Sequence, residues 1–178
     1  MPQPWKCTFG VGSEKFLGFM ITHQGIEANP NKCTAILEMQ SPNNIREVQK
    51  LNGRWAFLSR FLSKLVEKTK PFYKLLRKTE SFLWNEACKQ AFLALKKTIA
   101  TPPVLSWPKP GASLFLYLSV AEKAISSTLV QEDGKYQTPI YFVSHILHDV
   151  GKRYQMIEKV ALALITSAQR LKPYFQSP

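Results

Sequence analysis

The sequence is poor in cysteine and has no long apolar run. Its three cysteines, Cys7, Cys33 and Cys88, lie far apart in 178 residues. They cannot form a C-x-x-C metal clamp, and an odd number argues against the disulfide framework of a secreted protein. No segment approaches about 18 consecutive apolar residues, so no transmembrane helix is predicted. The opening segment 1–10 also lacks the apolar centre of a signal peptide. We therefore expect an intracellular protein, in either cytoplasm or nucleus, with no membrane association.

Histidine is equally scarce, which bears on metal binding. His145 and His148 are close in sequence, but no further histidine or nearby cysteine completes a zinc set. We expect neither a metal site nor a cofactor.

Acidic residues are few relative to basic ones. The chain has 24 lysines and arginines against 12 aspartates and glutamates, a net charge of +12. The excess is uneven, because residues 1–78 carry a net +8 and residues 79–178 a net +4. A strongly basic half indicates a polyanionic partner, most often nucleic acid. A solvated basic surface is the alternative.

The N-terminal part predicts a hairpin and then a helix. Lys15 to Thr22 is an apolar, aromatic-rich strand, residues 23–25 form a turn, and residues 26–28 begin the return strand. Asn29 then suits a helix N-cap and Pro30 a first helical turn. This helix is expected to reach about Gln40, before Pro42.

The segment from Asn44 to Leu62 predicts an amphipathic helix with a basic ridge. Asn44 and Glu47 have the spacing of a capping box, and Gly53 indicates a bend or break. Apolar residues recur at steps of three and four: Ile45, Val48, Leu51, Trp55, Leu58 and Leu62. Off this stripe, Arg46, Lys50 and Arg54 recur every four residues.

The rest of the chain predicts two more helical segments, a linker, three strands and a long helix. A short basic helix is expected over residues 70–80, and another from Trp84-Asn85 to about Ile99, with Cys88 on its apolar face. The proline-rich segment 101–111 reads as an extended linker. Strands over 113–119, 124–131 and 137–144 predict an antiparallel meander. The last helix, about 153–171, has an apolar stripe expected to face the core: Tyr154, Ile157, Ala161, Leu164, Ala168 and Leu171.

This order of motifs resembles the pol polyprotein of gypsy-type long-terminal-repeat retrotransposons, especially those of plants. "KCTFGVGSEKFLGFMITHQGIEANPNK" resembles the end of a reverse transcriptase palm, and "IREVQKLNGRWAFLSRFL" through "PFYKLL" resembles the thumb. "FLWNEACKQAFLALKKTIATPPVLSWP" is similar to a connector. "LFLYLSVAEKAISSTLVQ", "TPIYFVSHIL" and "RYQMIEKVALALITSAQRLKPYF" are similar to the first three strands and first helix of an RNase H domain.

The resemblance implies an α+β fold in four parts. A palm remnant with a primer-grip-like hairpin covers residues 1–29, and a small helical thumb-like region covers 30–78. A connector helix and proline-rich linker cover 79–112, and a truncated, RNase H-like βββα unit covers 113–178. In the hairpin, the primer-grip-like residues are Phe16, Leu17, Gly18 and Phe19.

The resemblance also implies that catalytic groups are missing. The paired aspartates of the family's polymerase site lie upstream of "KCTFGV", so this chain is not expected to polymerise. RNase H chemistry needs carboxylates that hold two magnesium ions. The family's first aspartate and its helix glutamate correspond to Ser119 and Val160, and its next aspartate would lie beyond Phe175. Glu122 and Glu158 are poorly placed to substitute. We expect no enzymatic activity from this chain.

Several functions stay open on the sequence alone. In the family the thumb grips the template–primer duplex. The resemblance therefore implies that this chain binds RNA–DNA or DNA duplex weakly. The implied phosphate contacts are Arg46, Lys50, Arg54, Arg60 and Lys64. Trp55 and Phe57 are expected in the core rather than as stacking platforms. The alternatives are a domesticated protein-interaction module, an RNase H fragment active only within a longer polyprotein, and a relic without a role.

A possible protein contact follows from the predicted sheet. In the RNase H fold the strand Leu114–Ser119 is central, and its second neighbour follows the first helix. Without that neighbour the strand has an open, apolar edge, which is a template for strand addition. We expect a partner, a second copy of the chain or the N-terminal segment to cover it.

Overall fold

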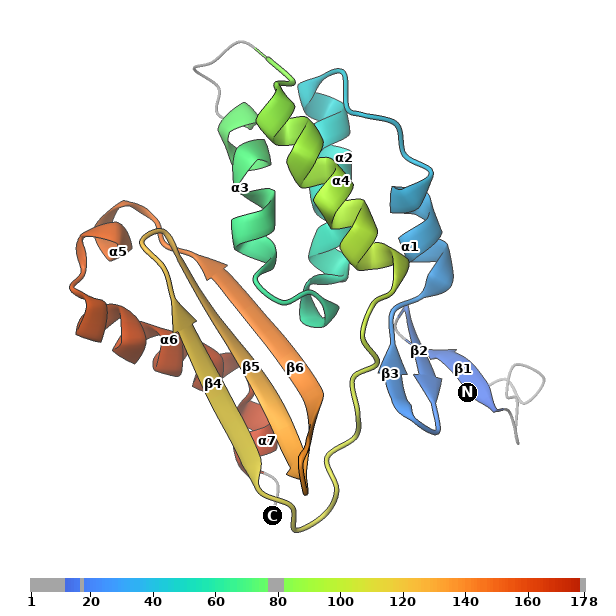
Figure 1. Cartoon of the computed structure of the whole chain (residues 1–178), viewed down its shortest axis with the longest axis vertical. Coiled ribbons are helices and arrows are strands. Elements are labelled where there is room, and N and C mark those ends of the chain that lie inside the picture. Colours follow the sequence, from blue (N-terminus) through green and yellow to red (C-terminus); the bar gives the residue numbers. More distant parts are fainter. Residues whose placement is uncertain (1–11, 17, 77–81, 177–178) are drawn as a thin grey trace, which may run out of the picture.

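The computed structural model describes residues 12–16, 18–76 and 82–176, and Figure 1 shows their arrangement. A small sheet, β1–β3, leads into a group of four helices, α1–α4. An extended segment then connects α4 to a second sheet, β4–β6; α6 and α7 lie along one face of that sheet, and α5 lies beyond the end with the β4–β5 turn. The expected α+β class is confirmed. None of the described helices is long and apolar enough to cross a membrane.

The N-terminal sheet has one strand more than predicted. Instead of one strand over Lys15–Thr22, β1 (Ser13–Phe16) pairs antiparallel with β2 (Phe19–Thr22), which pairs with β3 (Gly25–Glu27). Gly18 makes this turn possible: its φ is +83°, and an added Cβ would lie 2.6 Å from the Phe57 ring. Leu17 lies outside the described residues.

The helices begin where their caps predict. Asn29, Asn44 and Asn85 each accept a backbone N–H at the start of α1 (Pro30–Leu37), α2 (Ile45–Phe57) and α4 (Glu86–Ala100). The capping box is only partly formed, because Glu47 accepts from the N–H of Asn43 rather than Asn44. The predicted break at Gly53 was wrong: α2 runs through it. A 3₁₀ turn, η2 (Ser59–Phe61), and α3 (Leu65–Leu75) follow.

The four helices enclose the main core. The stripe predicted for this segment is buried except for half-buried Ile45, and Trp55 of α2 packs against Phe72 of α3 with ring centroids 5.0 Å apart. Phe72 in turn stacks on Trp84. The same apolar cluster includes residues of α4 and Leu105 of the extended segment. The predicted domain boundaries stay a prediction, but this core joins the helical region to the predicted connector.

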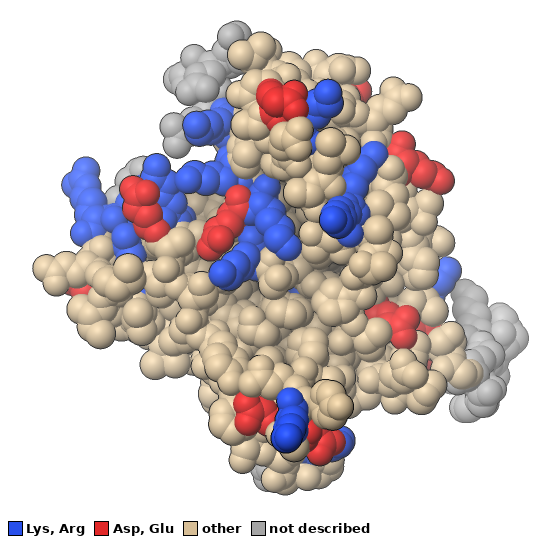
Figure 2. Space-filling view, viewed as in Figure 1, with Lys and Arg blue, Asp and Glu red and all other residues tan. Residues whose placement is uncertain are grey.

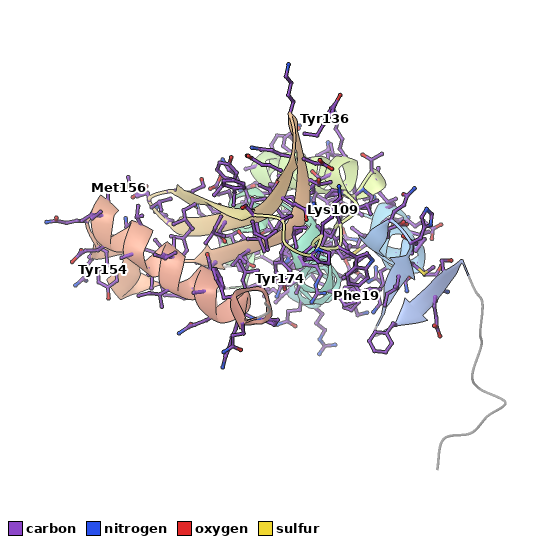
Figure 3. The ribbon with its side chains drawn as sticks, turned by 90° about the horizontal axis from the view of Figure 1, so that it is seen from below. Phe19, Lys109, Tyr136, Tyr154, Met156 and Tyr174 are labelled. Carbon is purple, nitrogen blue, oxygen red and sulfur yellow. The ribbon has the colours of Figure 1, made fainter. Side chains whose placement is uncertain are left out.

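The extended segment ties the two sheets together. Leu105 forms an antiparallel bridge with Ile26, with N–O distances of 2.7 and 2.9 Å, and the Ser106 N–H donates to the Pro139 carbonyl. The predicted meander is confirmed: β4 (Leu114–Val120), β5 (Ala124–Asp133) and β6 (Tyr136–Ile146) are antiparallel, in the order β4-β5-β6. Figure 3 shows Tyr136 at the tip of the β5–β6 hairpin, pointing away from the body.

The C-terminal helix is found where it was predicted but buries a different face. The helix expected over residues 153–171 is α6 (Met156–Arg170), and the short helices α5 (Asp149–Arg153) and α7 (Lys172–Gln176) flank it. On α6 the buried residues are Lys159, Ala163 and Ser167. Most of the stripe predicted to face the core is exposed: Tyr154, Ile157, Ala161, Leu164 and Ala168. Figure 3 shows Tyr154 and Met156 at the outer end of this helix.

The small side chains on α6 explain this orientation. Ala163 and Ser167 allow the helix to lie close to the sheet, where the hydroxyls of Ser167 and Ser127 hydrogen-bond at 2.7 Å. Lys159 is buried by its stem, while its ammonium group donates to the Glu122 carbonyl at 3.1 Å. Because of this close packing and these hydrogen bonds, α6 turns its small side chains to the sheet and leaves most of the apolar stripe exposed.

Candidate nucleic-acid interface

The predicted basic ridge lies on the solvent side of α2. Arg46, Lys50 and Arg54 are all exposed, and the buried face of the same helix is formed by Val48, Leu51 and Trp55. Arg54 is also a packing residue, because its Nη1 donates to the Ala35 carbonyl at 2.6 Å. Arg46 and Lys50 thus present the more available charges of the ridge to a phosphate backbone.

Arg60 differs from the ridge in its environment. Its guanidinium lies over the Phe19 ring at 4.4 Å and over the Tyr141 ring at 5.2 Å, so it occupies the space between β2 and β6. Lys64 is exposed and adopts the left-handed conformation, with φ of 51°, at the residue before α3. Arg60 is therefore half-buried against two rings, whereas the other predicted phosphate contacts are exposed.

The primer-grip-like residues are also divided between solvent and core. Phe16 is 57% exposed on β1. Phe19 is half-buried and stacks on Phe57, with ring centroids 4.7 Å apart. The expectation that Trp55 and Phe57 belong to the core is confirmed, because Trp55 is buried and Phe57 packs against the main cluster.

Ser119 and Val160 lie on two elements that meet at one end of the second sheet. Ser119 pairs with Ser126 across β4 and β5, and the hydrogen bond from Lys159 to Glu122 brings the start of α6 to the turn after β4. Glu122 is exposed in this turn, and the Glu158 carboxylate accepts the Gln155 N–H as part of a capping box.

Within the described ranges, no three histidine, cysteine, aspartate or glutamate side chains are grouped so that they could hold a metal ion. No arrangement of carboxylates suited to a magnesium pair is therefore found among them.

A groove lies between α3 and the β4–β5 turn, and the sequence did not predict it. It has a volume of about 460 Å³, and lysines come to it from three elements: Lys70, Lys74, Lys123 and Lys152. Figure 2 shows basic side chains gathered in this region, with acidic ones among them. The pair on α3 was visible in sequence as basic positions one turn apart, but nothing in the sequence brings Lys123 and Lys152 beside it.

Burial shifts the pKa of several groups near these surfaces. It lowers the pKa of Lys68, whose ammonium group donates to the Thr98 hydroxyl at 3.5 Å. It also lowers the pKa of His145, with a further contribution from His148 and Arg170. For Tyr174, burial and then Tyr141 raise the pKa, and Arg60 opposes them. None of these shifts creates an acid–base pair suited to catalysis.

The open strand edge expected in the second sheet is present in the described part of the chain. There β4 pairs only with β5, and β1–β3 form a separate sheet. Phe115 and Tyr117 on β4 are 42% and 49% exposed. No described strand pairs with the free side of β4, so the expected pairing with the N-terminal segment is not found among those residues.

Comparison with known proteins places this geometry in a family. A family model described as "RNase H-like domain found in reverse transcriptase" matches residues 84–178, more than half of the chain. The retrovirus-related Pol polyprotein from transposon opus of Drosophila melanogaster is 28% identical over 171 residues, which cover 90% of this chain and 17% of that protein. The transposon Tf2-3 polyprotein of Schizosaccharomyces pombe is 26% identical over 174 residues, covering 97% of this chain and 13% of that one.

Solved structures agree on the fold. The foamy viral protease-reverse transcriptase in complex with RNA/DNA hybrid matches with a TM-score of 0.75 at 20% identity, over 90% of this chain and 22% of that one. The same viral protein in complex with dsDNA matches with a TM-score of 0.71 at 21% identity, over 89% of this chain and 34% of that one. This chain spans about a sixth of the first of these Pol polyproteins. It belongs to the family of RNase H-like domains found in reverse transcriptases.

Proposed function

We propose that this chain is a catalytically inactive segment of a retrotransposon reverse transcriptase and RNase H region that binds nucleic-acid duplex weakly through its helical part. The observation that carries this proposal is the exposed row of Arg46, Lys50 and Arg54 on α2. The similar foamy viral proteins were solved with RNA/DNA hybrid and dsDNA, which favours the same class of ligand here. The quoted sequence motifs further suggest a plant gypsy-type origin.

Duplex binding is tested by titrating a fluorescein-labelled RNA–DNA hybrid at several salt concentrations. We expect a dissociation constant of about 10⁻⁴ to 10⁻⁶ M at physiological salt, with little dependence on sequence. Each phosphate contact adds about −0.9 to the slope of log K against log salt. The double variant Arg46→Glu/Lys50→Glu should bind more weakly and flatten the slope, whereas Lys135→Glu, on an exposed turn, should not.

If the double variant Arg46→Glu/Lys50→Glu also binds as the parent does, the ridge is only a solvated surface.

The proposed inactivity rests on the neutral side chains at Ser119 and Val160. Magnesium prefers oxygen ligands with charge, which a hydroxyl supplies poorly and an isopropyl group not at all. Purified protein should leave the RNA strand of a hybrid intact in magnesium or manganese. Cleavage that EDTA abolishes would contradict the proposal.

A protein-interaction role, including a domesticated one, is the second candidate. It is favoured by the open edge of β4 and by the exposed apolar side chains of α6, such as Ile157 at 71% and Leu164 at 50%. Hydrogen exchange of the amides of residues 114–119 distinguishes the cases. Protection that appears only in a dimer or a complex supports intermolecular strand addition, and strong protection in a verified monomer contradicts it.

A further inference from the structure

The groove between α3 and the β4–β5 turn has two walls that are fixed to the same sheet. On one side, the Val66 N–H at the start of α3 donates to Ser144 Oγ of β6 at 3.2 Å. On the other side, the Lys123 carbonyl accepts the Leu147 N–H at 3.0 Å. The turn is closed by the Ala121 N–H, which donates to the Ala124 carbonyl at 2.8 Å. The groove is therefore a feature of the folded sheet and not of a loose loop.

Buried Lys159 supports the turn from below. Its ammonium group donates to the carbonyl of Glu122 at 3.1 Å, so α6 holds the residue beside Lys123 in place. Lys123 itself is exposed. The backbone that presents this charge is thus fixed by hydrogen bonds from three elements, and a ligand would not have to order it.

The charges around the groove favour an anion. Four lysines and two glutamates, Glu67 and Glu122, contribute to its walls and leave a net charge of +2. Among the described residues, the ammonium groups of Lys70 and Lys123 form no ion pair. A bound anion would give the ammonium groups of Lys70 and Lys123 a partner of opposite charge.

The spacing of the lysines favours a chain of phosphates over a single one. Lys70 and Lys74 are one helical turn apart, about 6 Å along α3. On one strand of a duplex, successive phosphates follow one another about every 3.4 Å along the helix axis, so more than one phosphate lies within the length of this pair. Lys123 stands across the groove from this pair, and Tyr73 contributes to the same wall as the pair.

We infer that this groove binds consecutive phosphates of a nucleic-acid strand through Lys70, Lys74 and Lys123. This inference rests on the proposed duplex binding and assigns to it a second contact site, separate from the α2 ridge. It places one contact on the helical region and another on the RNase H-like sheet, so a bound strand would bridge the two parts of the molecule.

The test compares matched lysine variants of the whole chain, using the labelled RNA–DNA hybrid as the probe. Lys70→Ala/Lys123→Ala removes charge from both walls of the groove, and Lys89→Ala/Lys97→Ala removes the same charge from exposed positions of α4. We expect the groove variant to bind about tenfold more weakly at low salt and to lose about 1.8 from the salt slope. The α4 variant should bind as the parent does.

An NMR titration of ¹⁵N-labelled parent protein identifies the bound surface directly. Hybrid should shift the amides of residues 66–70 and 121–124, and these shifts should vanish in the groove variant. Inorganic triphosphate serves as the second probe, and a groove that takes triphosphate but ignores hybrid overturns the nucleic-acid assignment.

Shifts confined to α2, with a groove variant that binds as the parent, overturn the groove and leave the proposed function standing. No binding of hybrid by the parent overturns both.

Discussion

At the scale of single residues, the charged side chains divide into those that pack and those that face solvent. Arg54, Arg60 and Lys159 each contact a carbonyl or a ring, although Arg54 and Arg60 were predicted to contact phosphate. Arg46, Lys50 and Lys123 are exposed. Residue type alone could not separate these groups, because the separation depends on which carbonyls and rings the fold brings near.

The two described cysteines should be protected from modification. Cys33 and Cys88 are buried, and burial raises the pKa of both thiols. A raised pKa leaves less thiolate at neutral pH, and the thiolate is the reactive form. In a Cys7→Ser variant, Ellman's reagent should therefore react slowly with native protein at pH 7.5 and rapidly in urea. Fast reaction of the native variant would show that the helical core opens locally.

Restoring the two carboxylates should not create a nuclease. Ser119→Asp/Val160→Glu would place two acidic groups at the end of the sheet where α6 meets the β4–β5 turn. A magnesium pair needs a larger cluster of carboxylates, and no three-residue cluster is present among the described residues. Hybrid incubated with the double variant and magnesium should stay intact on a denaturing gel, with an active RNase H as positive control. Magnesium-dependent cleavage by the variant would contradict this.

At the scale of elements, the starts of three helices were predictable, whereas the bounds of α3, expected over residues 70–80 and found at Leu65–Leu75, and the packing of the last helix were not. Asparagine caps, prolines and the α2 stripe act locally, so they placed α1, α2 and α4 from the sequence. The orientation of α6 depends on its fit to a sheet formed by distant residues. Ala163 and Ser167 permit a close approach that apolar periodicity does not describe.

The Ser127–Ser167 contact provides a test of this packing. Both hydroxyls are buried and lie 2.7 Å apart, and Ser167 also donates to the Ala163 carbonyl at 2.6 Å. Ser167→Ala should lower the free energy of unfolding by about 1–3 kcal/mol, because it leaves the Ser127 hydroxyl without its partner. Ser127→Ala/Ser167→Ala should cost less than the sum of the single changes.

Urea unfolding of the four proteins of this cycle measures the coupling, and Ser59→Ala, at an exposed position, serves as the control. Additive effects would show that the two hydroxyls do not support each other.

At the scale of the whole molecule, a row of rings joined by Arg60 links parts that are distant in sequence. Phe57 of α2 stacks on Phe19 of β2, Arg60 lies over Phe19 and Tyr141 of β6, and Tyr141 meets Tyr174 of α7 edge to face. Figure 3 shows Phe19 and Tyr174 on the same side of the molecule. The row connects the first sheet, the helices and the second sheet. The cation at its centre, Arg60, should therefore help to hold these parts together.

Arg60 should therefore contribute to stability more than to ligand binding. Arg60→Ala removes two cation–π contacts from a half-buried site and should lower the free energy of unfolding by about 1–2 kcal/mol. Arg46→Ala, at an exposed position, should change it by less than about 0.5 kcal/mol. The salt slope of hybrid binding should respond in the opposite order, falling by about 0.9 for Arg46→Ala and remaining at the parent value for Arg60→Ala. Urea unfolding and fluorescence titration of the same two variants measure both quantities. If Arg60→Ala flattens the salt slope without loss of stability, Arg60 is a phosphate contact and the row of rings does not hold the two sheets together.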